Sequence, residues 1–387
     1  MSKQSVELLL EGEPLTMKKA TIRRGTVALA AIAAFTLFHW LTIEAQSTAQ
    51  QQPQTSAQEK TVDQTRKNIQ ALKGLPDSQL LSVMNMFTAS LGVRCDFCHV
   101  RTGNEWAYEK DDKKAKQTAR KMIEMTINLN KASFEGKPEV SCFTCHVGHE
   151  HPPTVPPLPR ALPPREEGRR PAEAWPTPQQ IVDKYIAAVG GKDAAAKLKT
   201  RVIKGSYVNV QGNTLPVEMW FESPSKLLII VNGQQGVITQ ALVGDAGWVK
   251  MGERQREMDM AEIARIRSLA LGLGALQLRE PYPRMTFGGK EKIGDREAFI
   301  LRMMTPDRRP VRLYFDTETG LLLRRYTLTP TPVGVDPEQL DFEDYRDVDG
   351  IKVPFSIRVS YLMLQPPATY KLTEVKHNVA IEESKFK

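Results

Sequence analysis

Apolar positions recur at helical spacing in three stretches before residue 200. The first helix is predicted from Asp77 or Ser78 to Leu91, with Gly92 placed to end it. The second runs from about 112 to 131, and the third from about 178 to 198, where a Gly-Gly pair interrupts it. The apolar stripe of the first helix is Leu80, Met84, Phe87 and Leu91; that of the second is Ala115, Ala119, Met122, Thr126 and Leu129, with Met125 beside it.

Beyond residue 200 the pattern changes to short alternating runs of apolar and polar residues, divided by turn signals such as Gln211-Gly212-Asn213. A predicted helix at about 258–278 interrupts these runs. We therefore expect an antiparallel sheet that curves around a helix. The predicted strands are 202–210, 217–222, 226–231, 236–243, 248–251, 298–304, 312–315, 321–328 and 357–364.

The N-terminal segment has the pattern of an export signal. Basic residues at positions 18, 19, 23 and 24 precede an apolar run at 27–43. The stretch 25–45 is also long enough to remain as a membrane anchor, and Met17 is an alternative start of the chain. A Gln-, Ser- and Thr-rich spacer follows, and a proline-rich linker lies at 152–178.

The composition is typical of a globular protein, since 41% of the residues are hydrophobic and 25% are charged. The net charge is +8, but the basic residues are scattered among acidic ones, as in Lys110-Asp111-Asp112-Lys113-Lys114. No stripe of basic and aromatic residues stands out. The sequence therefore argues against a nucleic acid as partner.

All four cysteines lie in two copies of one motif, C-x-x-C-H, at 95–99 and 142–146. This pattern is typical of covalent c-type haem attachment. Two thiols at this spacing can bond to one edge of a porphyrin, and the adjacent histidine then offers its imidazole to the iron. We therefore expect two covalently bound haems c. The expected anchors are Cys95, Cys98, Cys142 and Cys145, and the expected proximal ligands are His99 and His146.

Three other kinds of cysteine site compete with this interpretation. Four thiolates could bind zinc, although such a site needs no histidine after each pair. Two-residue disulfide loops are mostly redox-active, and two in tandem would be unusual. A thioredoxin-like site requires a βαβ unit, which the flanking sequence does not offer. The haem interpretation is favoured over all three, and zinc comes next.

A methionine on either predicted helix could be the distal ligand of an iron. Methionine on an apolar helix face is usually core filler, but a haem tethered nearby favours a thioether ligand. Met84 is preferred to Met86 because it lies on the apolar stripe, and spacing alone does not separate Met122 from Met125. Two histidines are alternative ligands, although we interpret them as exposed side chains: His149 and His151.

Several segments around the motifs match the sequence pattern of a known family. They are 84–99 (MNMFTASLGVRCDFCH), 119–126, 128–130 and 140–146 (VSCFTCH). Over about 62–153 the chain thereby resembles the cytochrome c subunit of photosynthetic reaction centres. In that family each haem follows a helix that supplies a distal methionine, which implies Met84 for the first haem and Met122 for the second. The well-known subunit has four such units and re-reduces the photo-oxidised chlorophyll pair. In the C-terminal part, 185–191 and 315–321 are similar to lipoprotein-carrier-like half-barrels of the periplasm.

These observations predict a multidomain fold class: a mostly α, haem-wrapped c-type cytochrome domain, followed by an α+β domain with a curved antiparallel sheet. The expected parts are the signal peptide or anchor at 1–45, the spacer at 46–59, the cytochrome domain at 60–151, the linker at 152–178 and the half-barrel-like domain at 179–387.

The expected function is transport of single electrons in the periplasm, between redox proteins or with a membrane-bound reaction centre or respiratory complex. A non-photosynthetic periplasmic carrier is an alternative. With both axial positions of each iron filled, no enzymatic turnover is expected. A peroxidase-like haem enzyme is the alternative if one iron lacks its methionine.

Overall fold

The computed structural model describes residues 59–103, 105–155, 175–222, 225–233, 236–273, 285–305, 308–362 and 366–386. The predicted signal or anchor at 1–45, nearly all of the spacer and residues 156–174 of the predicted linker lie outside the described residues. Within the described ranges, no helix is long and apolar enough to cross a membrane.

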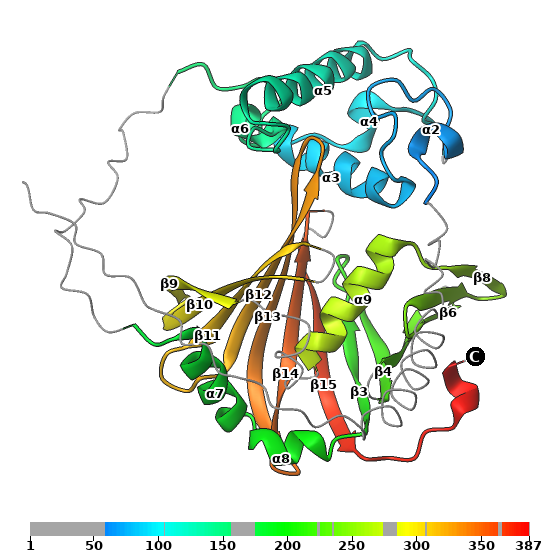
Figure 1. Ribbon diagram of the computed structural model, residues 1–387. Helices are drawn as coiled ribbons and strands as arrows, with labels where there is room; N and C mark the ends of the chain where they lie inside the picture. Colours follow the sequence, from blue (N-terminus) through cyan, green and yellow to red (C-terminus); the bar gives the residue numbers. More distant parts are fainter. Residues whose placement is uncertain are drawn as a thin grey trace, which may run out of the picture. The chain divides into compact units, whose positions relative to one another are not determined.

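One antiparallel sheet of thirteen strands dominates the described residues (Figure 1), in the order β8-β7-β6-β5-β4-β3-β15-β14-β13-β12-β11-β10-β9. Its two edges are therefore β8 and β9. The strands are β3 (Thr200–Val208), β4 (Thr214–Glu222), β5 (Lys226–Gly233), β6 (Gly236–Val243), β7 (Ala246–Met251), β8 (Arg254–Glu257), β9 (Met285–Ile293), β10 (Arg296–Met304), β11 (Pro310–Asp316), β12 (Leu322–Thr331), β13 (Gly334–Val348), β14 (Ile351–Tyr361) and β15 (Ala368–His377).

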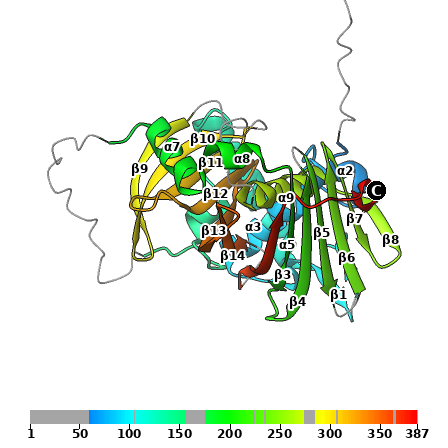
Figure 2. The same ribbon diagram turned by 90° about the horizontal axis from the view of Figure 1, so that it is seen from below.

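Side chains alternate between the two sides of the sheet, and one side carries the large core. Ile203 of β3 lies opposite Met219 of β4, which lies opposite Ile229 of β5, and each of the three is at most 1% exposed. Helix α9 (Met260–Leu273) packs on this face through Ile263, Ile266 and Leu269. Figures 1 and 2 both show α9 inside the curve of the strands, so the predicted sheet around a helix is present.

Helix α7 (Pro178–Ala188) begins with a reciprocal cap, in which Thr177 Oγ1 accepts from the Gln180 amide at 3.2 Å and Gln180 Oε1 accepts from the Thr177 amide at 2.8 Å. Gly190, at φ +123°, then turns the chain, and a Cβ atom there would clash with the Gly350 carbonyl. A short helix α8 (Gly191–Ala196) follows. The predicted interruption of this helix is thereby confirmed.

Residues 59–151 contain several helices and one small hairpin, β1 (Val100–Thr102) with β2 (Glu105–Ala107). Both predicted helices are present within three residues of their expected ends. The helical segments are α2 (Val62–Thr65), the 3-10 turn η1 (Asp77–Gln79), α3 (Leu80–Leu91), α4 (Cys95–Cys98), α5 (Lys114–Ser133) and α6 (Cys142–His146), and η2 (Glu383–Phe386) lies near the C-terminus.

The predicted fold class is wrong. The described residues are 28% helical and 43% strand, so the chain is dominated by its sheet, and helices that wrap a haem are not evident. The two motifs instead form helices of one turn, α4 and α6. The long helices also do not form separate units with their own motifs, because α3 packs against α6, and α5 contacts both α4 and α6.

Four strands of the sheet were not predicted: β8, β9, β13 and β15. All residues of β8 are exposed, so the strand shows no alternation, and β9 contains a Gly-Gly pair. Strand β13 contains the charged residues Glu338 and Asp341, which are buried although charged residues usually lie at the surface. Asp341 is paired with Arg324 at 2.6 Å and with Arg358 at 3.3 Å, while Glu338 accepts a hydrogen bond from Ser268. Such pairing makes the burial of a charge tolerable, but periodicity cannot reveal it.

A buried histidine predicts acid sensitivity of the sheet. The side chain of His377 is 3% exposed, and it lies in register with Arg201 and 3.5 Å from Asp349. Burial, and secondarily Arg201, lower the pKa of His377 from 6.5, so the folded state favours the neutral ring. As the pH falls below about 6.5, the unfolded chain binds the proton more readily and stability is lost.

Denaturant unfolding at about pH 7.5 and 5.5 measures this effect. The loss of stability is expected to be smaller in His377→Gln than in the unsubstituted chain. The control His151→Gln removes a side chain that is 90% exposed and should leave the loss unchanged. Equal pH dependence in all three proteins would contradict the prediction.

Candidate functional site

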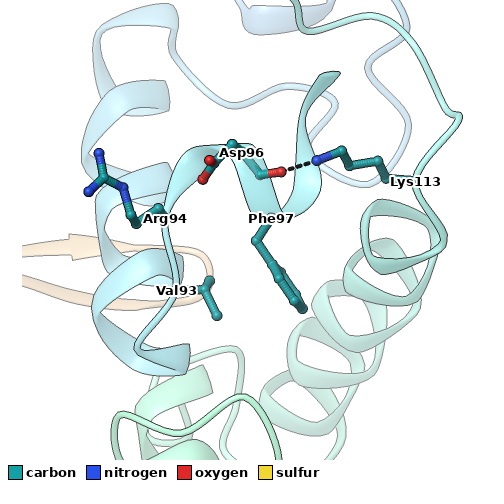
Figure 3. A pocket seen from close by; sticks show the side chains of 5 residues that line it. All are labelled: Val93, Arg94, Asp96, Phe97 and Lys113. Atoms are coloured by element: carbon teal, nitrogen blue, oxygen red, sulfur yellow. Dashed lines mark hydrogen bonds between the residues drawn. The ribbon is translucent and has the colours of Figure 1, made fainter. Parts of the chain in front are cut away.

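The first motif forms α4, which packs against α5. The Lys113 ammonium group, just before α5, donates a hydrogen bond to the Asp96 carbonyl and so ties the two elements together. An open pocket of about 460 Å³ lies beside the motif (Figure 3), lined by Val93, Arg94, Asp96, Phe97 and Lys113. In Figure 3 the Val93 and Phe97 side chains point the same way, and Arg94 points away from them.

The His99 ring is held by the hairpin that follows the motif. The Tyr108 ring stands edge-on to it at 5.1 Å, and Trp106 stacks on Tyr108 at 5.5 Å. The His99 Nδ1 atom is buried and has no hydrogen-bond partner among the described residues. Burial, and then the charge of Lys116, lower the pKa of His99. Burial therefore favours the neutral imidazole, the form in which histidine ligates metal.

The second motif forms α6, which two contacts from the long helices hold in place. The Gly148 amide donates to the Ser90 carbonyl at the end of α3, at 2.9 Å. Asn130 of α5 bridges Val140, donating from Nδ2 to its carbonyl at 2.7 Å and accepting from its amide at 3.0 Å. The chain before and after α6 is therefore fixed to α5 and α3 respectively.

The His146 ring is oriented by its own loop. Its Nδ1 atom lies 2.9 Å from the His149 carbonyl oxygen, which can only accept, so we assign the proton to Nδ1. The Nε2 atom then carries the lone pair. A backbone carbonyl in this role is the usual way to fix the tautomer of a metal-ligating histidine. The His149 and His151 side chains themselves are exposed.

Each motif has one exposed and one shielded thiol. Cys95 and Cys145 are exposed, Cys98 is half-buried and Cys142 is buried. Burial raises the pKa of Cys98, and it raises that of Cys142 to about 11. None of the four is in a disulfide, and within the described ranges no three His, Cys, Asp or Glu residues cluster as metal ligands.

The candidate methionines differ in burial. Met86 is 4% exposed and lies in the small core of this region, whereas Met84 is half-buried at its rim. On α5 the predicted apolar stripe is divided: Met122 and Leu129 are 38% and 41% exposed, and Met125 beside them is 51% exposed, whereas Thr126 of the same stripe is buried. The buried face of α5 instead consists of Lys116, Ile123, Thr126 and Asn130.

These residues fit a c-type haem at the second motif. Next to the stripe on α5, helix α6 adds Phe143 and Val147, which are 53% and 49% exposed. Helices usually bury their apolar face, so an uncovered one beside paired thiols indicates a missing apolar surface. Cys142 and Cys145 would anchor the group, His146 Nε2 would ligate its iron, and the stripe would contact its apolar face. At the first motif, Cys95, Cys98 and His99 have the same spacing and would hold the same kind of group.

Several residues that shape the site were not identified from the sequence. Asn130 and Lys116 looked like solvent-facing helix positions, but they are 2% and 9% exposed. Lys116 donates to the Tyr108 and Lys110 carbonyls, each at 2.7 Å, and pairs with Asp111 at 2.9 Å. The hairpin after the first motif could have been predicted from the two aromatic residues Trp106 and Tyr108, which are spaced as on one face of a strand.

Removing Asn130 should loosen the second motif. Asn130→Ala leaves the amide and carbonyl of Val140 without their partner, which is expected to lower the free energy of unfolding by about 1–3 kcal/mol. Denaturant unfolding measures the loss, and amide exchange should locate it at 140–148. The control Asn128→Ala removes an exposed side chain and should stay within about 0.5 kcal/mol. Equal effects of the two substitutions would show that the bridge contributes nothing.

Comparison with known proteins agrees with the motifs. Residues 12–180 match the family described as photosynthetic reaction centre cytochrome c subunit. The photosynthetic reaction center cytochrome c subunit of Roseobacter denitrificans is 34% identical over 94 residues, which are 22% of this chain and 25% of that protein. The chain thus aligns with about a quarter of this relative's length.

Solved structures with low similarity to this chain include the following two. A DUF1329 family protein from Desulfovibrio piger has a TM-score of 0.40 and 14% identity, covering 54% of this chain and 96% of that one. A LolA superfamily protein from Nitrosomonas europaea has a TM-score of 0.39 and 10% identity, covering 55% and 98%. Both TM-scores are low. The description of the fold given above therefore uses only the strand order of this chain. The resemblance carried by the haem motifs is confirmed: residues 12–180 of this chain are similar to the cytochrome c subunit of photosynthetic reaction centres.

Proposed function

We propose that this chain is a two-haem c-type cytochrome that carries single electrons. The observation that supports this most directly is the second motif, where paired thiols, an oriented histidine and an uncovered apolar stripe meet. The match of residues 12–180 to a cytochrome family supports it independently. When bound, a haem c supplies an iron that cycles between two oxidation states and so accepts and releases one electron.

The residues of the chain have distinct roles in this proposal. The thiols of Cys95, Cys98, Cys142 and Cys145 would attach the haems, and His99 and His146 would ligate their irons. Met84 and Met122 would supply the other protein ligand of each iron. Because Met86 is enclosed in the core, the half-buried Met84 is the better candidate on α3. With thioethers in the distal positions, no substrate reaches the irons, so we propose electron transfer without enzymatic turnover.

We further propose that the protein works in the periplasm, exported by its N-terminal signal and associated with the inner membrane. Its partners would be redox proteins, including a membrane-bound reaction centre or respiratory complex. Two motifs are half the number in the well-known subunit, so we propose a short relay between two partners in place of a long chain of haems.

The number of haems tests the proposal directly. A pyridine haemochrome assay of the full chain, made in a host that attaches haem c, should give two haems per chain. Replacing Cys95 and Cys98 by serine should leave one, and so should replacing Cys142 and Cys145. A chain without any haem would contradict the proposal.

The distal ligand on α5 can be tested by spectroscopy. Ferric haem with a methionine ligand has a weak far-red charge-transfer band, which should lose about half its intensity in Met122→Ala, because one of two such haems is affected. Met125→Ala is the matched control, since it removes a neighbouring exposed methionine of the same helix. If the band falls in Met125→Ala and not in Met122→Ala, the two assignments are exchanged.

A further inference from the structure

The core of the region around the motifs is small and is not built from that region alone. Its buried members are Val62, Leu72, Leu75, Val83, Met86, Ile123 and, from the turn between β12 and β13, Val333. Val333 is 0% exposed. Leu362, which follows β14, packs against the same cluster. Residues of the sheet therefore complete this core, although more than about 200 positions separate them from its other members in the sequence.

The backbone of the same turn lies against the start of the second motif. A Cβ atom on Gly334 would lie 2.7 Å from Ser141 Cβ and 2.8 Å from Met86 Sδ, so no side chain fits there. The turn is closed by Thr331 Oγ1, which donates to the Gly334 carbonyl at 2.8 Å. Gly334 itself has a φ of +145°, a conformation that favours glycine.

Ser141 is the residue from which α6 starts. It is the N-cap of the helix and forms a reciprocal cap with Thr144, whose hydroxyl accepts from the Ser141 amide at 3.0 Å. A helix of one turn has no stability of its own, because the cost of starting it is not repaid by further turns. The orientation of Cys142 and His146 therefore depends on what holds Ser141.

Polar contacts reinforce this junction. Arg265 of α9 donates to the buried Ser82 hydroxyl of α3 at 3.1 Å, and Asp336 of β13 hydrogen-bonds to the same hydroxyl. The Arg265 guanidinium also lies 5.6 Å from the centre of the Tyr361 ring. Helix α3 is thus fixed to the sheet at Ser82 and at Met86, one helical turn apart on one face.

We propose that the turn at Thr331–Gly334 is a positioning element of the second motif, with Val333 and Gly334 as its positioning residues. Val333 fills the core beneath α3, and the backbone at Gly334 fixes Ser141 and hence the start of α6. The sheet domain is then part of the machinery that presents Cys142, Cys145 and His146. This proposal concerns how the motif is held and is independent of what the motif binds.

Amide hydrogen exchange of the full chain tests the proposal with or without haem. Val333→Ala and Gly334→Ala should each speed exchange at 141–148 by about tenfold or more, while exchange at 95–99 changes far less. Both substitutions act at the tip of a hairpin, so exchange in β3 to β5 reports whether the sheet itself remains folded.

Two control variants match the substitutions. Gly212→Ala places a side chain in another turn of the sheet at positive φ, +80°, with nothing within 4 Å, and should leave 141–148 unchanged. Val217→Ala removes the same two methyl groups from the core of the sheet, where Val217 is 1% exposed. It should speed exchange in the sheet without a selective effect on α6.

In the haem-loaded protein, redox titration supplies a second measurement that general destabilisation would not change. The midpoint potential of one of the two haems should shift in Gly334→Ala. This should be the haem that is lost when Cys142 and Cys145 are replaced. The proposal is overturned if 141–148 exchanges as in the unsubstituted chain in both tip variants, or if 95–99 accelerates equally. If the chain binds no haem, the proposed function is wrong. The exchange experiment then still tests the positioning proposal.

Discussion

Helices α4 and α6 contain four and five residues, and neither can form without support from elsewhere in the chain. Everything that the motifs could do depends on that support. For α4 it comes from α5, through the hydrogen bond between Lys113 and Asp96. For α6 it comes from the end of α3, from Asn130 of α5 and from the sheet turn at Gly334. The rest of the structure can be understood as the frame that supplies these contacts.

The two long helices show why a prosthetic group suits this frame. On α5 the side chains that hold the protein together are largely polar, including Lys116, Thr126 and Asn130, while the methionines face outward. On α3 the fully buried face likewise includes Ser82 and Ser90, and the stripe with Met84 is half-buried. A chain that needed these stripes only for its own core would have buried them. The exposure of Met122, Met125 and Leu129 on α5, which contacts α6 with its thiol pair, is the strongest physical argument for an apolar cofactor.

Some strands of the sheet could be predicted from the pattern of apolar and polar residues, and others could not. Strands β3 to β7 contain runs of apolar residues, and all five were predicted close to their observed positions, although burial alternates clearly only along β7. Strand β13 was missed, because Glu338 and Asp341 are buried and read as surface residues. Their partners, Ser268, Arg324 and Arg358, come from α9, β12 and β14. A buried charge is tolerated only when such partners are in place, and the partners become known only with the strand order.

The sequence by itself determined the two C-x-x-C-H motifs, the helices that precede them and most of the central strands, because these depend on local spacing and periodicity. It overestimated the helical share of the fold. Only the tertiary structure separated the enclosed Met86 from Met84 and showed that Met122 and Met125 of α5 are exposed. Only the tertiary structure brought Val333 and Gly334 to the second motif. Those contacts join residues far apart in the chain, so no local pattern records them, and they decide how the motifs are held.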